Sequence, residues 1–328
     1  MSAVAALRHI DATSYVPHDL HAGARAWAES NCYIDVWIEV LHALGCEPTA
    51  CLPFVLGLDW EGDQFTFFKP PLEDLFEAYG VEVQELTVYR TILANAAEQL
   101  RGGNLVLTEA DAFYLPDTAG TDYRSHHTKT TIGIQEIDLD ARALGYFHNA
   151  SYHVLRDADF VGLFRLDAPP DPTFMPLFAE RVRTRRVVRL ETHALVERSV
   201  ALLCKHLARR PTENPIAPFS NRFERDIEAL RDEGIEAYHQ YAFATVRQLG
   251  AAFELAACYL RWLAERGAQD LEASVEAFDV ISLTGKSLIL KAARAVGAKK
   301  TVDFVPMLHE LENQWTAGVG HLAKRFGA

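Results

Sequence analysis

A cysteine at the start of a predicted helix is the first residue in this sequence that could do chemistry. Cys32 follows the polar residues Glu29-Ser30-Asn31 and opens the stretch CYIDVWIEVLHALG, whose apolar residues recur at helical spacing. The N-terminus of a helix carries a partial positive charge and free N–H groups, which stabilise a thiolate and favour a nucleophilic cysteine. The alternative is that Cys32 is simply a small buried hydrophobic residue, a role that free cysteines often have.

A group of histidines could supply the base that a thiol nucleophile needs. His126, His127, His148 and His153 lie within 28 residues of one another, and such a group could also bind a metal ion. Neighbouring strand residues point to opposite faces of a sheet, so His126 and His127 could hardly share one ion. We therefore expect no metal and no other cofactor. A histidine metalloenzyme remains an alternative, as does a surface or core position for each ring.

The order of three residues along the chain resembles the arrangement in papain-like enzymes. Cys32 begins a helix, His127 begins the predicted strand HTKTTIGI, and Asn149 follows the next predicted strand, ALGYFHN. A thiol nucleophile needs a base beside it and a third group that orients the base. In papain-type histidine strands a glycine follows the histidine by six residues, and here that glycine is Gly133.

The stretch GNLVLTEADAFYLPDTAGTDYRSHHTKTTIGI, residues 103–134, resembles the corresponding strands and the D-x-Y-Y-L-P segment of the butirosin-biosynthesis-protein-H-like group. Members of that group are papain-fold acyltransferases, which take an acyl group from a carrier-protein thioester and pass it to an amine. The whole chain, with its helical second half, most resembles a bacterial family described as domain of unknown function 1839. The resemblance implies that Cys32 is the nucleophile, His127 the general base and Asn149 the orienting residue.

The sequence departs from the papain pattern where the oxyanion would be stabilised. Papain-like proteases have a glutamine six residues before the cysteine, and this position is Ala26 here. The oxyanion would need the Cys32 backbone N–H and a second donor, for which Asn31 and Ser30 are the candidates. Two other histidines are alternative members of the triad. His126 could replace His127 as the base, and His148 could replace Asn149 as the orienting residue.

Composition and charge exclude several classes of protein. The chain has 328 residues, enough for two domains, and its formal net charge of −13 argues against general nucleic-acid binding. No apolar run is as long as a membrane span, and the first residues do not have the pattern of a signal peptide. Five cysteines without a CxxC pair fit a reducing compartment better than a disulfide framework. We therefore expect a cytoplasmic protein that binds neither nucleic acid nor membrane.

The predicted fold class is α+β, with two domains. Before residue 167 the patterns predict helices at 32–44, 71–79 and 87–100, and strands at 51–58, 64–68, 104–108, 129–136 and 143–147. The proline-rich stretch DAPPDPTF, residues 167–174, is the predicted boundary. Beyond it, helical spacing covers 174–209, 223–266, 271–296 and 304–326. We expect a papain-like Cys/His/Asn domain over residues 1–167 and an all-helical domain over residues 168–328.

The predicted function is acyl transfer through a thioester on Cys32. The donor would be an acyl carrier protein or another thioester, and the acceptor a small-molecule amine, as in natural-product biosynthesis. A thiolate exchanges readily with a thioester because the two leaving groups are similar, and His127 would deprotonate the amine. The alternatives are a cysteine amidohydrolase or peptidase-like enzyme, and a catalytically inactive binding protein of the same fold.

An arginine-rich stretch is the predicted docking site for the donor. RVRTRRVVR, residues 181–189, puts five arginines into an otherwise acidic chain, and arginine pairs well with the phosphate and carboxylates of a carrier protein. The alternative is a solvated helix face that pairs with nearby glutamates. The five residues are Arg181, Arg183, Arg185, Arg186 and Arg189.

Overall fold

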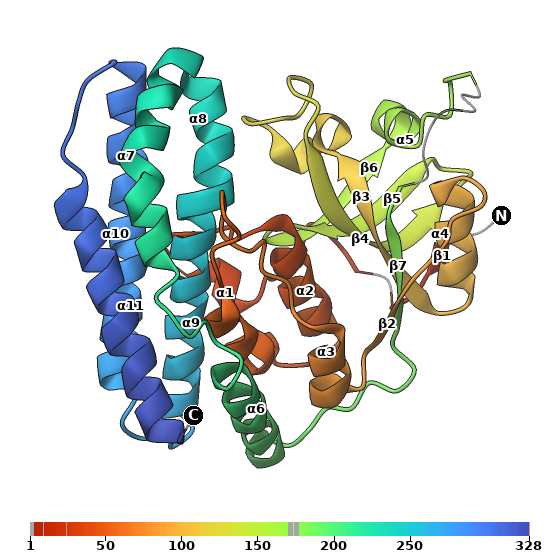
Figure 1. Ribbon diagram of the computed structural model, residues 1–328. Helices are drawn as coiled ribbons and strands as arrows, with labels where there is room; N and C mark the ends of the chain where they lie inside the picture. Colours follow the sequence, from red (N-terminus) through yellow and green to blue (C-terminus); the bar gives the residue numbers. More distant parts are fainter. Residues whose placement is uncertain (1–2, 9, 24, 170–172, 174–176, 328) are drawn as a thin grey trace. The chain divides into compact units, whose positions relative to one another are not determined.

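The computed structural model describes residues 3–8, 10–23, 25–169, 173 and 177–327. The described chain has a mixed α+β fold, with a sheet in its N-terminal region and helices in its C-terminal region (Figure 1). It divides into two compact units. The first, which we call the sheet unit, comprises Met1–Ala22, Cys32–Pro48 and Leu72–Arg189; the second, the helical unit, comprises Gly23–Asn31, Thr49–Pro71 and Leu190–Ala328.

The sheet unit is built around an antiparallel sheet. The strands follow the order β2-β7-β3-β4-β5-β6, and the short β1 pairs with β4. Because every pairing is antiparallel, side chains alternate between two faces along each strand. The strand bounds are Val4–Ala5 for β1, Glu82–Glu85 for β2, Asn104–Asp111 for β3, Lys129–Asp138 for β4, Ala143–His148 for β5, Ser151–Arg156 for β6 and Ala179–Arg183 for β7.

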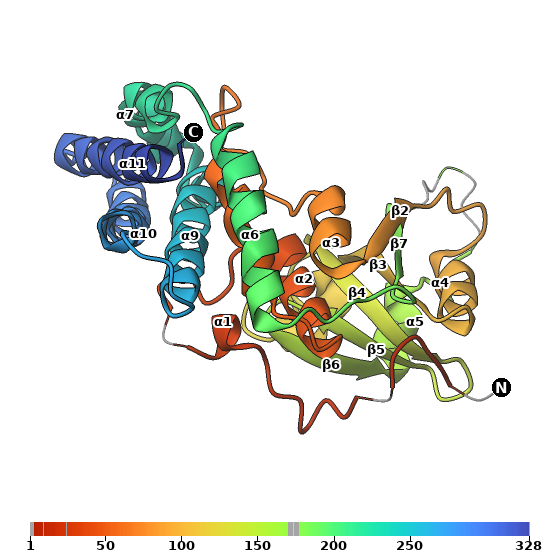
Figure 2. The same ribbon diagram turned by 90° about the horizontal axis from the view of Figure 1, so that it is seen from below.

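Helices lie on both faces of this sheet. Figures 1 and 2 show α2 (Cys32–Ala43) on one side, and α4 (Ile92–Arg101) and α5 (Asp157–Leu163) on the other. On the α2 face, a Cβ added at Gly133 of β4 would come within 3.1 Å of Val36. On the other face, Ile132 and Ile134 belong to one buried cluster with residues of α4 and α5. The remaining helices of this unit are α1 (Asp19–Ala22) and α3 (Leu72–Tyr79).

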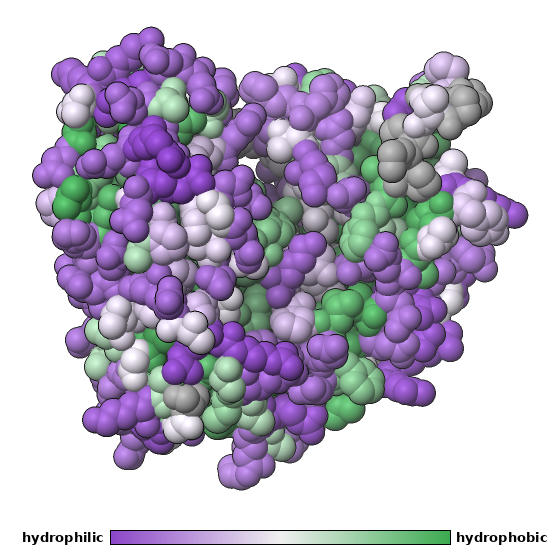
Figure 3. All heavy atoms as spheres, in the orientation of Figure 1, coloured by the Kyte–Doolittle hydropathy of each residue, from purple (hydrophilic) through white to green (hydrophobic). Residues whose placement is uncertain are grey.

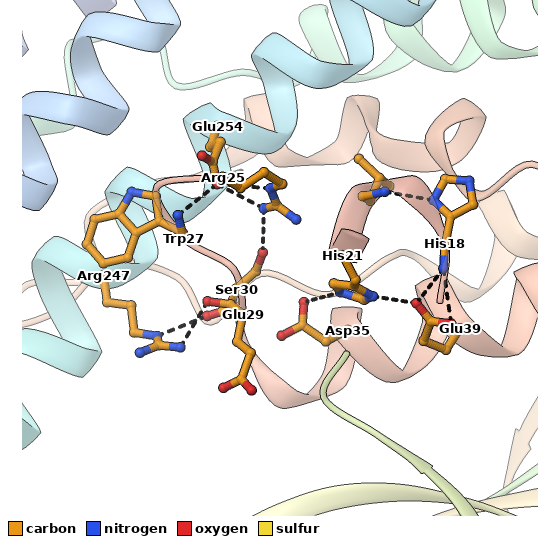
Figure 4. A network of polar contacts seen from close by, with 11 residues as sticks. His18, His21, Arg25, Trp27, Glu29, Ser30, Asp35, Glu39, Arg247 and Glu254 are labelled. Atoms are coloured by element: carbon orange, nitrogen blue, oxygen red, sulfur yellow. Dashed lines mark hydrogen bonds and ion pairs between the residues drawn. The ribbon is translucent and has the colours of Figure 1, made fainter. Parts of the chain in front are cut away.

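A buried ionic cluster fastens α1 to α2. The His21 ring contacts Glu39 (Nδ1–Oε1 2.5 Å) and Asp35 (Nε2–Oδ1 3.3 Å), and all three side chains are fully buried (Figure 4). Tyr15 donates its hydroxyl to Glu39 at 2.6 Å, and the His18 backbone N–H donates to the same carboxylate. Burial alone would lower the pKa of His21, but the hydrogen bonds and charges of Asp35 and Glu39 outweigh it and raise the pKa to about 9.

This cluster predicts a pH-dependent stability of the sheet unit. The pKa of His21 is higher in the folded protein than its ordinary value of 6.5, so the stabilisation is complete below about pH 6.5 and is lost as the pH rises through about 9. The effect is on the order of 3 kcal/mol. In urea denaturation of the full chain from pH 6 to pH 9.5, the free energy of unfolding of the wild type should fall as the pH rises. His21→Gln should remove most of this fall. His126→Gln, at an exposed ring, should keep the wild-type dependence of the free energy of unfolding on pH. An equal dependence in all three proteins would contradict the role of His21.

The helical unit packs around α9 (Gln248–Ala264), of which 14 residues are buried. The helix pairs with α10 (Glu272–Gly297), which in turn packs against α11 (Val305–Phe326). The other helical segments of this unit are η1 (Pro48–Gly57), α6 (Thr192–Leu207), α7 (Ile216–Glu233), α8 (Ile235–Ala242) and the π-helix η4 (Phe243–Arg247). Gly234, with φ +103°, ends α7 and breaks what the spacing predicts as one helix over 223–266.

The segment Gly23–Asn31 is held against α9 by one carboxylate. Glu254 accepts hydrogen bonds from the Arg25 side chain and from the backbone N–H groups of Ala26 and Trp27 (Figure 4). The Trp27 indole lies over Gly250, where an added Cβ would come within 2.4 Å of the ring. Glycine at this position is therefore required by the close approach of an aromatic side chain.

Gly250→Ala should destabilise the helical unit by about 1–3 kcal/mol, because a rigid ring must move to admit the methyl group. The matched control is Gly297→Ala at the end of α10, where an added Cβ meets nothing within 4 Å. Alanine is the better helix former, so this control should be neutral or slightly stabilising. Urea midpoints of the two variants check the prediction, which fails if they shift equally.

Two predicted strands are wrong. Residues 51–58 fall largely within the 3-10 helix η1, and within the described chain residues 64–68 contribute only the isolated pair Trp60↔Phe65. The run CLPFVLGL is apolar throughout, and such a run does not distinguish a buried strand from a buried helical segment. By contrast, the strands predicted at 104–108, 129–136 and 143–147 are confirmed as the cores of β3, β4 and β5.

The predicted helix over 174–209 is also wrong in its first half, and this changes the division of the chain. β7 lies between β2 and β3, so residues up to Arg189 belong to the sheet unit, whereas the predicted boundary is at 167. Residues 170–172 and 174 of the predicted connector lie outside the described residues. Charged residues can occupy this inner strand because they have partners: Glu180 accepts from the Tyr33 hydroxyl at 2.7 Å, and Arg183 pairs with Glu82 at 2.9 Å.

The arginine-rich stretch therefore lies on β7 and the following loop, and not on a helix. Arg181 and Arg183 both face Glu82, at 3.9 and 2.9 Å. Arg185 donates to the backbone carbonyl of Gly102, and Arg189 to that of Leu44. Several of these side chains thus hold the sheet unit together. The arginines do not lie on a helix, so both predictions of a helix face, for docking or for solvent, are wrong in this respect.

The surface seen in Figure 3 is mostly hydrophilic, with hydrophobic residues in small groups. In the part of the chain that the structure describes, none of the helices combines the length and the apolar character needed to cross a membrane.

Candidate functional site

The Cys32 thiol lies at the start of α2 against the sheet. Cys32 is the first residue of the helix, and its side chain is partly exposed. The Sγ atom donates to the Thr131 hydroxyl on β4 at 3.7 Å. The backbone N–H groups of a first helical turn point toward the N-terminus of the helix, where this thiol lies. The predicted position of Cys32 at a helix N-terminus is confirmed.

A set of polar residues follows Thr131 along the same face of the sheet. Thr131 is directly opposite Glu109 of β3, and Lys129 is opposite Asp111. Lys129 donates to Glu109 at 3.1 Å. Same-face neighbours along a strand are two residues apart, about 7 Å. The polar groups therefore extend from the thiol toward the end of β3, and sequence analysis missed Glu109, Lys129 and Thr131.

His127 lies at the far end of this polar set. Its Nδ1 is 2.6 Å from Oδ2 of Asp111, and its ring stacks on Phe113 with the ring centres 4.4 Å apart. The residue precedes β4 by two positions, and its side chain is 67% exposed. Among the described residues, no hydrogen bond joins the His127 ring to the Cys32 thiol. In the structure the partner of His127 is therefore the Asp111 carboxylate, and the β4 side chain bonded to Cys32 is Thr131.

Asn149 begins the two-residue turn between β5 and β6, in the left-handed conformation with φ +46°. Asparagine tolerates this conformation better than most residues, which gives Asn149 a local structural role. β4 and β5 pair at Gly133↔Phe147; two residues further along, this register leads to Thr131 and Asn149. A threonine therefore occupies the strand position beside Cys32 where the sequence pattern calls for the histidine.

The two alternative histidines have other partners. His148 contacts Thr130 and Asp117, at 2.8 and 2.5 Å. Like its same-face neighbour Tyr146, it lies on the face opposite α2, and is thus separated from Cys32 by the sheet. His126 is exposed, with its Nδ1 3.3 Å from the Thr121 carbonyl oxygen.

The two oxyanion candidates have hydrogen bonds within the helical unit. The Asn31 side-chain amide donates to the Phe68 carbonyl at 3.0 Å, and Ser30 Oγ accepts from Arg25 at 3.2 Å. The Ser30 carbonyl accepts from Arg247 (Figure 4). Both side chains are buried. These contacts hold Ser30 and Asn31 within the helical unit.

A cavity of about 1170 Å³ opens beside the strands β3 and β4 of the sheet unit. His127, Asp111 and Lys129 line it, as do apolar residues of α4, α5 and β4. A cavity of this size accommodates a small-molecule ligand. As for metals, no three His, Cys, Asp or Glu side chains within the described ranges are arranged to hold an ion.

These observations define an α+β protein with a sheet unit that carries a thiol at a helix start, and a separate helical unit. The residues 16–184 match the DUF1839 N-terminal domain, and residues 192–324 match the DUF1839 C-terminal domain. The chain belongs to the DUF1839 family, as the sequence resemblance predicts. The junction between the two family domains falls beside Arg189, where the structure also divides the chain. No curated protein matches the chain.

The burial of the cysteines predicts which thiol reacts first. Burial raises the pKa of the Cys46 thiol to about 11 and also raises that of Cys258, and Cys51 is 1% exposed. We expect iodoacetamide at pH 7 to alkylate Cys32 at least tenfold faster than these three cysteines, since the thiolate is the reacting species. Peptide mapping over time measures the rates. Cys204, which is partly exposed but lies within α6, is the internal control, and faster labelling there would contradict a reactive Cys32.

Proposed function

We propose that the protein is a cysteine-dependent acyltransferase with a papain-like sheet unit, in which Cys32 carries the acyl group as a thioester. The observation that carries this proposal is the partly exposed thiol on the first residue of α2, bonded to Thr131 on β4. A nucleophilic cysteine at the start of a helix that packs on an antiparallel sheet is the arrangement implied by the resemblance to papain-fold acyltransferases.

The first half-reaction requires only the thiol and a thioester donor. The Cys32 sulfur attacks the donor carbonyl, the donor thiolate leaves and takes up the proton that Cys32 lost, and the acyl group remains on the enzyme. A thioester is exchanged for a thioester, so the step is close to balanced in free energy. It does not depend on a hydrogen bond between Cys32 and His127.

The second half-reaction requires a base for the amine. We assign this role to His127, acting through a chain of bound waters, because the ring precedes Thr131 by four residues, about 14 Å along an extended strand. Asp111 binds its Nδ1 and so leaves Nε2 to accept, by way of the waters, the proton of the attacking amine and later to return it to the Cys32 sulfur. Asp111 thereby takes the orienting role that the sequence pattern gives to Asn149. The amine attacks the acyl carbonyl, the amide forms, and the Cys32 thiol is released.

The donor that we propose is an acyl carrier protein. Arg185 and Arg186 are exposed, and with Arg183 and Asn104 they line a cavity of about 310 Å³ at one end of the sheet. In a chain of net charge −13, such a local basic site is suited to an acidic partner. Arg181 and Arg183 share Glu82, so Arg185 and Arg186 carry most of this role.

A second candidate function is binding without catalysis. It is favoured by the threonine that occupies the strand position beside Cys32, and by the separate hydrogen-bond partners of Cys32 and His127. On this alternative the family keeps the fold and the cavity as a ligand site, and Cys32 is a packing residue.

Acyl loading distinguishes the two functions. We expect incubation with an acyl N-acetylcysteamine thioester to add one acyl group to the wild-type chain, detected by intact-mass spectrometry and mapped to Cys32. Cys32→Ala should lose the adduct, and Cys204→Ala should keep it. No adduct on the folded wild-type protein supports the binding protein, and rapid loss of the adduct to water supports the amidohydrolase alternative.

A further inference from the structure

A second set of catalytic-type groups lies on the other face of the sheet. The Thr130 hydroxyl is 2.8 Å from Nε2 of His148, and Nδ1 of the same ring is 2.5 Å from Oδ2 of Asp117. A hydroxyl, an imidazole and a carboxylate in this order form the hydrogen-bond relay that activates an oxygen nucleophile. All three residues are more than nine-tenths buried at the groups concerned: Thr130 is 7% exposed, and the side chains of His148 and Asp117 are 1% and 7% exposed.

Asp117 is held in place by more than its bond to His148. Tyr146 donates its hydroxyl to Oδ1, and the His153 ring lies 3.9 Å from Oδ2. Burial by itself would raise the pKa of Asp117, but the hydrogen bond and charge of His148 outweigh it and lower the pKa. The carboxylate is therefore ionised at neutral pH and holds the imidazole with Nε2 toward Thr130.

The relay is next to the large cavity of the sheet unit. Along the chain Thr130 lies between Thr128, just before β4, and Ile132 on β4, and it is directly opposite Ala110 on β3. All three of these neighbours line the cavity. Same-face neighbours along a strand are about 7 Å apart, and directly opposite residues have Cα atoms about 5 Å apart. Thr130 is thus flanked on three sides by residues of the cavity lining.

The cavity lining indicates the class of ligand. Apolar side chains from α4, α5 and the sheet form much of it, and charged groups lie among them. An apolar wall of this kind can bind a hydrocarbon chain, and the charged groups can bind a polar group at one end of the same ligand. The larger apolar members are Ile92, Ile132, Val161, Leu163, Phe164 and Leu177.

We infer that Thr130, His148 and Asp117 form a second acyl-handling site, separate from Cys32, that hydrolyses esters of hydrophobic carboxylic acids bound in this cavity. Cys32 and Thr130 are on opposite faces of the sheet, and the second site uses neither Cys32 nor His127 as a reacting group. The inference therefore stands apart from the proposed thioester chemistry, and each can fail alone.

The reaction would use these groups in two steps. The Thr130 oxygen attacks the ester carbonyl while His148 Nε2 takes the hydroxyl proton; the alcohol then leaves with that proton, and an acyl-threonine ester remains. Water attacks this ester with His148 again as base, and the carboxylic acid is released with the Thr130 hydroxyl restored. Asp117 keeps its charge throughout and stabilises the imidazolium ion.

The test uses the full chain with Cys32→Ala, so that the thiol cannot contribute. We expect it to hydrolyse p-nitrophenyl octanoate and to take up one equivalent of an alkyl fluorophosphonate, with the adduct mapped to Thr130. Thr130→Val, which keeps the side-chain shape, and His148→Gln should each lower hydrolysis by about 100-fold or more. Thr301→Val, at an exposed threonine of the helical unit, should have no effect.

Adduct mapping decides the matter even if a variant does not fold. A folded chain, judged by far-UV circular dichroism, that forms no adduct on Thr130 would overturn the inference. So would ester hydrolysis that is unchanged in folded Thr130→Val. In either case the relay is a buried structural network, and acyl loading of Cys32 in the otherwise unmodified chain still reports separately on the proposed function.

Discussion

The close packing of α2 on β4 is the contact on which the candidate site depends. At Gly133 the helix side chain of Val36 would lie 3.1 Å from an added Cβ, so the two elements approach closely only because the strand has a glycine there. This contact places the first residue of α2 over Thr131. The buried cluster of His21, Asp35 and Glu39 also fastens the same helix, to α1. The position of Cys32 is therefore set by packing, before any partner of the thiol is considered.

Much of the fold could be predicted because the local patterns were clear. α2 shows helical spacing, and the observed helix ends within one residue of the prediction; β4 and β5 agree to within two residues. β7 could not be predicted from the sequence, because its alternating charges resemble an exposed helix. Only the long-range pairs of Glu180 with Tyr33 and of Arg183 with Glu82 explain how that strand enters the sheet. Because β7 belongs to the sheet, the sheet unit extends to Arg189 and not to the predicted boundary at 167.

The site could be predicted only in part, for a related reason. The position of Cys32 follows from local sequence, whereas its neighbours depend on strand register. Counting along HTKTTIGI cannot show that Thr131, and not His127, is the residue bonded to Cys32. Asp111, which is 16 residues from His127 in sequence, becomes its partner because β3 and β4 pair at Asp111↔Lys129. The sequence also indicates His148 as an alternative member of the triad. Side chains alternate along β5, however, and this alternation places His148 on the face of the sheet opposite α2.

The central claim, that Cys32 and His127 cooperate in passing an acyl group to an amine, is tested most directly by single-turnover discharge. Acyl-Cys32 protein, freed from donor, is mixed with a small primary amine, and the amide and the protein mass are followed together. The account predicts amide formation that returns the protein to its unmodified mass, slowed about 100-fold by His127→Gln and substantially by Asp111→Asn. An acyl-protein that transfers equally well in His127→Gln would contradict it, as would one that releases only the free acid.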